Sequence, residues 1–131
     1  MSFLLDTHLL LWLLSEPEKL PKRALAILEA GSDWVCASAV SIVEIAIKHK
    51  RNRGEEGDMP IDGSQALNLT EASGLPLVAL EADHAARLDQ LPLHHRDPFD
   101  RMLVAQAMAE GLILLTHDKA LAAYGDCVEV V

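Results

Sequence analysis

Short, continuous apolar runs constrain the fold of this chain more than any other feature. They lie at residues 2–5, 33–38, 75–80, 112–116 and 127–131, and segments with helical spacing of apolar side chains separate them. Runs that are apolar throughout, rather than at every second position, are typical of strands buried on both faces. Strands of this kind that alternate with helices predict an α/β fold with a mainly parallel sheet between layers of helices.

The segments between the apolar runs predict helices whose ends carry recognisable residues. Pro21 and Pro98 stand at helix starts, and Gly31 and Gly111 stand where helices should stop. Residues 52–63 are rich in glycine and charge and predict a surface loop. We find no internal repeat and no linker, so we expect a single domain over residues 1–131. The predicted helices cover residues 7–14, 21–31, 39–51, 64–74, 81–92, 98–111 and 118–125.

The overall charge argues against a protein that holds nucleic acid through bulk electrostatics. The 20 acidic residues outnumber the 11 basic ones, and the net charge is −9. Either nucleic acid is not the substrate, or cations mediate its binding, or a local basic patch matters more than the total. Residues 48–53 form the densest basic run, which is either a solvated helix end or a contact for phosphate.

The cellular location follows from the cysteines and from the apolar start of the chain. Cys36 and Cys127 are far apart and fit no metal or redox spacing, which favours a reduced, cytoplasmic protein. The apolar start is interrupted by Asp6 and His8 and is too short to span a membrane, so we expect no membrane segment.

Four carboxylates stand at positions where an α/β sheet forms its binding site or where their charge is hard to explain. Asp6 follows the first apolar run, Asp118 follows the run at 112–116, and Asp100 lies in the first turn of the helix at 98–111. Sites in open parallel sheets form beyond the carboxyl ends of the strands. Each of these three aspartates also has a structural explanation, as a helix cap or as a partner of the helix dipole. Glu44 has no such explanation, because it lies mid-helix among apolar neighbours, although Lys48 could pair with it.

Carboxylates gathered in one place repel one another unless something positive holds them. Hard divalent cations prefer oxygen ligands, so one or two Mg²⁺ or Mn²⁺ ions would satisfy the cluster. Such ions also activate water and neutralise charge on a phosphodiester. The sequence therefore predicts a metal site made by Asp6, Glu44, Asp100 and Asp118, and this site would offset the unfavourable sign of the net charge.

Longer motifs around these acids resemble the PIN-domain ribonucleases, above all the toxin half of VapBC toxin–antitoxin pairs. They are "LLDTHLLLW" at 4–12, "SAVSIVEIAIK" at 38–48 and "HRDPFDRMLVAQAMAEGLILLTHD" at 95–118. The resemblance implies a PIN-like three-layer α/β/α sandwich. By position, it assigns the acidic site to Asp6, Glu44, Asp100 and Asp118, the last often acting through water, and a site hydroxyl to Thr116. It also matches Ser38 to a small polar residue at a strand end, and we assign the motif residues Asp97 and Arg101 to capping and local pairing.

The same resemblance implies a function and partners. It implies a toxin that is a metal-dependent endoribonuclease, with tRNA or ribosomal RNA as candidate substrates and with 5′-phosphate and 3′-hydroxyl ends as products. It further implies a homodimer and a cognate antitoxin, VapB- or Phd-like, whose C-terminal tail enters the acidic pocket with an arginine.

Three alternatives compete with this interpretation. A histidine pair could cleave RNA without metal, but we expect His8, His94, His95 and His117 to be surface or loop residues. A receiver-type phosphorylation switch also combines aspartates with Mg²⁺, but it requires an acidic pair after the first strand. A PIN-like binding module with a silent site is the non-enzymatic alternative. Trp12 and Trp34 lie among apolar residues and are expected in the core rather than in a base-stacking surface.

Overall fold

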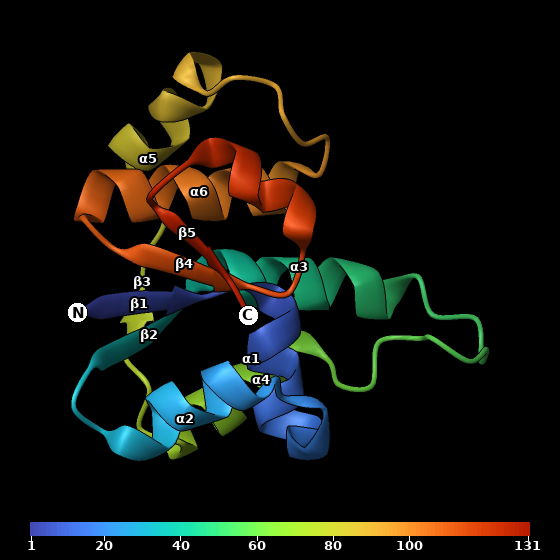
Figure 1. Cartoon of the computed structure of the whole chain (residues 1–131). Coiled ribbons are helices and arrows are strands. Elements are labelled where there is room, and N and C mark those ends of the chain that lie inside the picture. Colours follow the sequence, from blue (N-terminus) through green and yellow to red (C-terminus); the bar gives the residue numbers. More distant parts are fainter.

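A five-stranded sheet, parallel throughout and ordered β3-β2-β1-β4-β5, forms the middle layer of the protein. The computed structural model describes all residues from 1 to 131 (Figure 1). In the register of the sheet, Leu4 pairs with Cys36 on one side and with Leu114 on the other. The predicted parallel sheet is therefore confirmed. The strands are β1 (Ser2–Leu5), β2 (Trp34–Ser38), β3 (Leu77–Val78), β4 (Ile113–Thr116) and β5 (Val128–Val130).

Helices cover both faces of the sheet, as Figure 1 shows with α2 and α4 on one side and α5 and α6 on the other. Helix α3 packs against both α4 and α6, and α4 also contacts α1. This arrangement confirms the predicted three-layer α/β/α sandwich. The helices are α1 (Thr7–Ser15), α2 (Lys22–Ala30), α3 (Ala39–Lys50), α4 (Gly63–Ala72), α5 (Ala82–Ala86) and α6 (Pro98–Glu110).

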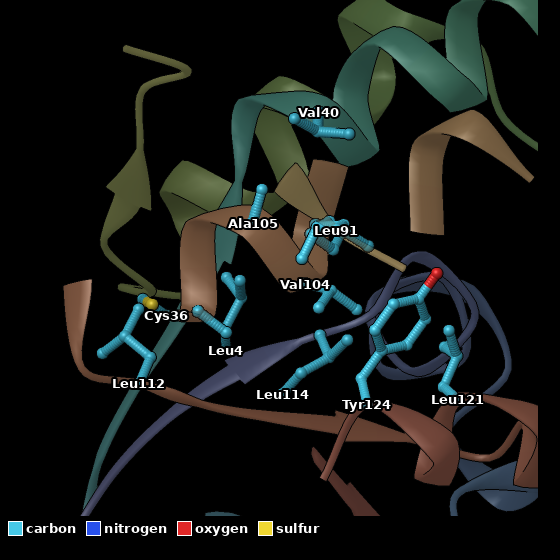
Figure 2. Close-up of a cluster of buried hydrophobic side chains, with 12 residues drawn as sticks. Leu4, Cys36, Val40, Leu91, Val104, Ala105, Leu112, Leu114, Leu121 and Tyr124 are labelled. Carbon is cyan, nitrogen blue, oxygen red and sulfur yellow. The ribbon is translucent and has the colours of Figure 1, made fainter. Parts of the chain in front are cut away.

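Successive residues of β1 pack into two different cores. Leu4 belongs to a cluster with Val104 of α6, which Figure 2 shows together with Tyr124. Phe3 and Leu5 point the opposite way, into a cluster with the first two helices. Neighbouring side chains of a strand point to opposite faces, so a strand covered on both sides must be apolar at every position. This is the physical reason why the uninterrupted apolar runs predicted the layers correctly.

The predicted helix ends are confirmed where the local residues determine them. Gly31 ends α2 and Gly111 ends α6, both with left-handed backbones at φ 65° and 66°. Asp97 caps α6 through its Oδ1, which accepts hydrogen bonds from the N–H groups of Phe99 and Asp100 at 2.9 and 3.4 Å. Asp62 closes the loop at 52–63 by forming a capping box at the start of α4.

Several predicted elements are shorter or tighter than the sequence suggested. The strand expected at 75–80 is reduced to β3, an edge strand with one neighbour. The helix expected at 81–92 is α5 followed by a 3₁₀ turn, η2 (Arg87–Gln90), because the chain becomes extended at the buried Leu91. The helix expected at 118–125 is also a 3₁₀ helix, η3 (Lys119–Tyr124), and a further one, η1 (Pro17–Lys19), follows α1.

The prediction that both tryptophans lie in the core is wrong for Trp34. Trp34 is the first residue of β2, and it is 47% exposed. Trp12 is partly buried against the cluster around α1 and α2. No helix of the structure combines the length and apolar character needed to cross a membrane.

Candidate active site

The carboxyl ends of β1 and β4 lie side by side at the point where the chain changes direction across the sheet. From β1 the chain proceeds to β2 and β3 on one side, and then returns to β4 on the other side. Such a switch point is where open α/β sheets form their binding sites. Asp6 follows β1 directly, and Thr116 is the last residue of β4. Thr116 Oγ1 donates a hydrogen bond to Asp6 Oδ2 at 2.5 Å, which connects the two strand ends.

Asp6 caps a helix and also lines the pocket at this end of the sheet. Its Oδ1 accepts a hydrogen bond from the backbone N–H of Leu9 at 2.8 Å and so caps α1. Its side chain is also buried, with 3% exposure, and it lines a pocket. Burial raises the pKa of Asp6, while the hydrogen bonds from Thr116 and Leu9 lower it. Burial is the larger effect, so the pKa of Asp6 lies above its usual value. Capping does not exclude a site role, because each carboxylate oxygen accepts one hydrogen bond, from Leu9 or from Thr116, and keeps a second lone pair.

Glu44 brings a buried carboxylate from α3 into the same pocket. Its Oε2 forms an ion pair with Lys48, the partner expected one helical turn later. Its Oε1 is buried and has no hydrogen-bond partner. Such an oxygen costs free energy unless a cation or donor meets it. A hydrogen bond of 2.9 Å from Thr7 Oγ1 to Ser41 Oγ holds α1 against α3 and so keeps Glu44 close to Asp6.

Asp100, in the first turn of α6, lies among several negative charges. Burial and the nearby carboxylates of Asp97, Glu44 and Asp6 together raise the pKa of Asp100 to about 7. His95 opposes this effect, but it does not reverse it. Without a nearby cation, it is therefore unfavourable for Asp6, Glu44 and Asp100 all to be ionised at the same time.

Asp118 lies at the rim of the pocket, with a side chain that is 43% exposed. Its Oδ1 accepts a hydrogen bond from the N–H of Ala120 at 2.9 Å and caps η3. Its Oδ2 lies 2.8 Å from Nε2 of His95. Partial burial alone would raise the pKa of Asp118, but the hydrogen bonds from His95 and Ala120 outweigh it and lower that pKa.

His95 is one of the pocket residues that the sequence interpretation missed, because we expected the histidines to be surface or loop residues. His95 is in a loop, but its ring turns inward and is 18% exposed. Besides Asp118, its Nε2 approaches Asp100 Oδ2 at 3.8 Å. The motif before α6 could have suggested this residue, since His95 is two positions from the cap Asp97. Nothing local indicated Asp118 as its partner.

These side chains enclose a pocket of about 380 Å³. Four of the predicted site residues line it, while Thr116 lies buried beneath Asp6. One lining residue is apolar, so the pocket is built for charged or strongly polar ligands. The lining residues are Asp6, Thr7, His8, Trp12, Glu44, Lys48, His95, Asp97, Asp100, His117 and Asp118.

Two further motif residues have structural contacts instead of positions in the pocket. Ser38 caps α3, since its Oγ accepts a hydrogen bond from Val40 N at 2.9 Å and donates to Gln106 Oε1 at 2.5 Å. Arg101 donates hydrogen bonds to the carbonyl oxygens of Leu88 and Leu91 at 2.9 and 3.3 Å. It therefore supports the loop before α6 and pairs with no carboxylate.

The donor atoms of the pocket fit a hard divalent cation. Carboxylates from the ends of β1 and β4, from α3 and from α6 line this one pocket, and Mg²⁺ and Mn²⁺ prefer such ligands. The unpartnered Oε1 of Glu44 and the raised pKa of Asp100 both indicate a site that lacks positive charge. The donor atoms that lie within 4.8 Å of one another are those of His95, Asp100 and Asp118, so Asp6 and Glu44 line the same pocket without joining this group.

Comparison with known proteins places this fold in a family. The sequence matches the PIN domain over residues 3–126. Among curated proteins no match was found. VapBC2 from Rickettsia felis, solved with a promoter DNA fragment, has 16% identity and a TM-score of 0.72, and the match covers 100% of this chain and 99% of the other. A toxin–antitoxin complex from Klebsiella pneumoniae has 21% identity and a TM-score of 0.65, with coverage of 98% and 97%.

A third structure, VapBC-5 from Mycobacterium tuberculosis, has 19% identity and a TM-score of 0.57, with coverage of 99% and 97%. At such low identities, the three likenesses show a shared fold. The strand order also differs from the 2-1-3-4-5 order of receiver domains, which removes the phosphorylation switch as an alternative. Because the family match extends over nearly the whole sequence, the chain belongs to the PIN domain family.

Proposed function

We propose that this chain is a VapC-type toxin of a toxin–antitoxin pair, and that it is an endoribonuclease dependent on Mg²⁺ or Mn²⁺. Membership of the PIN domain family supports a nuclease, and structural neighbours that are toxin–antitoxin complexes support the toxin assignment. The candidate substrates are tRNA and ribosomal RNA, which the protein would meet in the cytoplasm.

The observation that carries this proposal is a buried carboxylate oxygen without a partner. Glu44 Oε1 is buried in a pocket that already holds Asp6 and Asp100, and no donor meets it. A purely structural role would leave this oxygen with a permanent energetic cost. A divalent cation would remove the cost and would also balance the neighbouring carboxylates.

The side chains of the pocket divide into roles by burial. Asp6, Glu44 and Asp100 would hold the ion, and Asp118, at the exposed rim, would bind a second ion or orient the attacking water. When bound, the ion would lower the pKa of a coordinated water and neutralise charge on the scissile phosphate. Thr116, through its hydrogen bond to Asp6, keeps that carboxylate turned toward the pocket.

The substrate would reach the pocket past the basic end of α3. Lys48 lines the pocket, and His49 and Lys50 follow it in the last turn of the helix. Lys48 and Lys50 would attract an RNA backbone locally, although the net charge of the protein is −9. This proposal takes the second of the two roles that the sequence left open for residues 48–53, a contact for phosphate.

The same pocket would receive the antitoxin. We propose that the C-terminal tail of a VapB- or Phd-like antitoxin places an arginine among the carboxylates, since a guanidinium pairs with carboxylates through two parallel hydrogen bonds. The arginine would supply the positive charge that the cation otherwise provides, which explains how binding would silence the toxin. A homodimer of the toxin is part of the same proposal.

An Asp6→Asn variant tests the enzymatic proposal. Mn²⁺ would be titrated calorimetrically into the purified protein, and tRNA and ribosomal RNA would then be incubated with protein and Mn²⁺. We expect Asp6→Asn to lose cleavage while its circular dichroism remains that of the wild type. Asp89→Asn removes an equal charge at an exposed position outside the pocket, and it should cleave like the wild type.

Two results would contradict the proposal. Cleavage retained by Asp6→Asn would remove this carboxylate from the chemistry. Wild-type protein that binds no Mn²⁺ and cleaves none of these RNAs would favour a binding module with a silent site.

A further inference from the structure

His95 contacts the backbone on one side of its ring and the acidic site on the other. Its Nδ1 accepts a hydrogen bond from the backbone N–H of Asp97 at 3.1 Å. Its Nε2 lies 2.8 Å from Asp118 Oδ2 and 3.8 Å from Asp100 Oδ2. Each ring nitrogen therefore has a defined neighbour, and the two neighbours differ in whether they donate or accept.

These two contacts determine which nitrogen carries the proton. A backbone N–H can only donate, so Nδ1 must present its lone pair to Asp97. In the neutral ring the proton is then on Nε2, where it points at the carboxylate of Asp118. A doubly protonated ring would set an N–H of His95 against the N–H of Asp97. One tautomer therefore satisfies both contacts, and it leaves no lone pair on the nitrogen that faces the pocket.

This tautomer argues against His95 as a metal ligand, although its distances to Asp100 and Asp118 would allow it. A histidine that binds metal through one nitrogen usually donates its other N–H to a carbonyl or carboxylate. Here the other nitrogen faces a donor, which is the reverse arrangement. To bind a metal through Nε2, His95 would have to lose its contact with Asp97.

The geometry points to His95 as a positioning residue that holds Asp118 through its Nε2–H. In this role His95 does not itself coordinate the metal. This inference rests on the function proposed above. Asp118 is the most exposed of the four carboxylates, and the N–H of Ala120 holds its other oxygen. Because His95 precedes the cap of α6, its ring also fixes Asp118 relative to Asp100 on that helix. The ring thereby sets the spacing between two carboxylates that come from different elements.

Nitrogen NMR of the metal-free wild-type protein tests the tautomer directly. With ¹⁵N-labelled histidine, we expect the His95 ring to show a protonated Nε2 and an unprotonated Nδ1. The spectra would be recorded at a pH at which the ring is neutral, and a proton on Nδ1 with none on Nε2 would overturn the inference. This measurement needs neither metal nor RNA, so it decides about His95 even if the protein proves to bind no Mn²⁺ and to cleave no RNA.

Pulsed electron paramagnetic resonance of the Mn²⁺-loaded protein tests the ligand set. If His95 stays unbound to the metal, the wild type and the His95→Gln variant should show the same nitrogen couplings to Mn²⁺. A coupling that the variant loses would make His95 a ligand and would overturn the inference.

Cleavage kinetics separate positioning from a general structural role. His95→Ala should lower kcat about 10- to 100-fold with little change in KM, which is the usual effect of losing such a partner. His95→Gln places an amide N–H close to the position of Nε2 and should recover most of the loss. Recovery no better than in His95→Ala would contradict the inference. His94→Gln is the matched control, because that exposed ring packs on Tyr124 outside the pocket.

Discussion

Asp100→Asn should make the metal-free protein more stable at pH 8 while it weakens the binding of Mn²⁺. Burial, together with the charges of Asp97, Glu44 and Asp6, raises the pKa of Asp100 from 3.8 to about 7. An asparagine has nearly the same shape as aspartate, but it carries no charge for these neighbours to repel. The substitution therefore removes an unfavourable charge without opening a cavity.

The size of the effect follows from the displaced pKa. One pKa unit corresponds to about 1.4 kcal/mol, so the full displacement would cost the ionised native state about 4 kcal/mol. Water reaches the Asp100 side chain, which is 17% exposed, and this screening reduces the cost. We expect Asp100→Asn to raise the free energy of unfolding by about 2 kcal/mol at pH 8.

The sign of the pH dependence follows from which state binds the proton more tightly. The pKa of Asp100 is higher in the folded protein than in the unfolded chain, so the folded state holds more protons between about pH 4 and pH 7. Stability from this group is therefore greatest below pH 4, falls through that window, and stays low above pH 7. The advantage of the variant should shrink toward zero as the pH falls toward 4.

Urea denaturation of both proteins in EDTA, at several pH values from 4.5 to 8, provides the measurement. The difference between wild type and variant isolates Asp100, because other titrating groups are common to both. Added Mn²⁺ should reverse the order of stability, since a ligand stabilises the state that binds it. A variant less stable than wild type at pH 8 in EDTA, or an advantage independent of pH, would refute the reasoning.

Three further substitutions test other parts of the structure. Thr116→Val removes the hydrogen bond to Asp6 and should weaken Mn²⁺ affinity or cleavage about 10- to 100-fold. Thermal melting would check that the variant still folds. Unchanged affinity and cleavage would show that Asp6 does not need this hydrogen bond. Lys48→Met removes the cation paired with Glu44, so calorimetry should show tighter Mn²⁺ binding, and weaker binding would contradict competition between Lys48 and the metal. Leu114→Ala opens a cavity in the middle of the sheet and should lower the free energy of unfolding in urea by about 2–5 kcal/mol, whereas a loss under 1 kcal/mol would mean that the core collapses around the gap.

The sequence alone determined the layers, the main helix ends and the position of four carboxylates along the chain. The apolar runs predicted strands covered on both faces because adjacent residues of a strand face opposite layers. Gly31, Gly111 and Asp97 marked helix ends correctly, since those signals act over a few residues. The order of strands and helices also placed Asp6 and Asp118 at the carboxyl ends of strands.

Tertiary structure decided which of these residues meet and what their environment is. His95 and Asp118 are 23 positions apart, and their contact depends on how the loop before α6 folds over the end of β4. Trp34 is 47% exposed at the start of β2, although its apolar neighbours in the sequence predicted burial. The pKa of Asp100 likewise depends on its burial and on the charges of Glu44 and Asp6, which are distant from it in the sequence. Local patterns specify elements and their ends, whereas burial and charge at the site arise from contacts between residues distant in sequence.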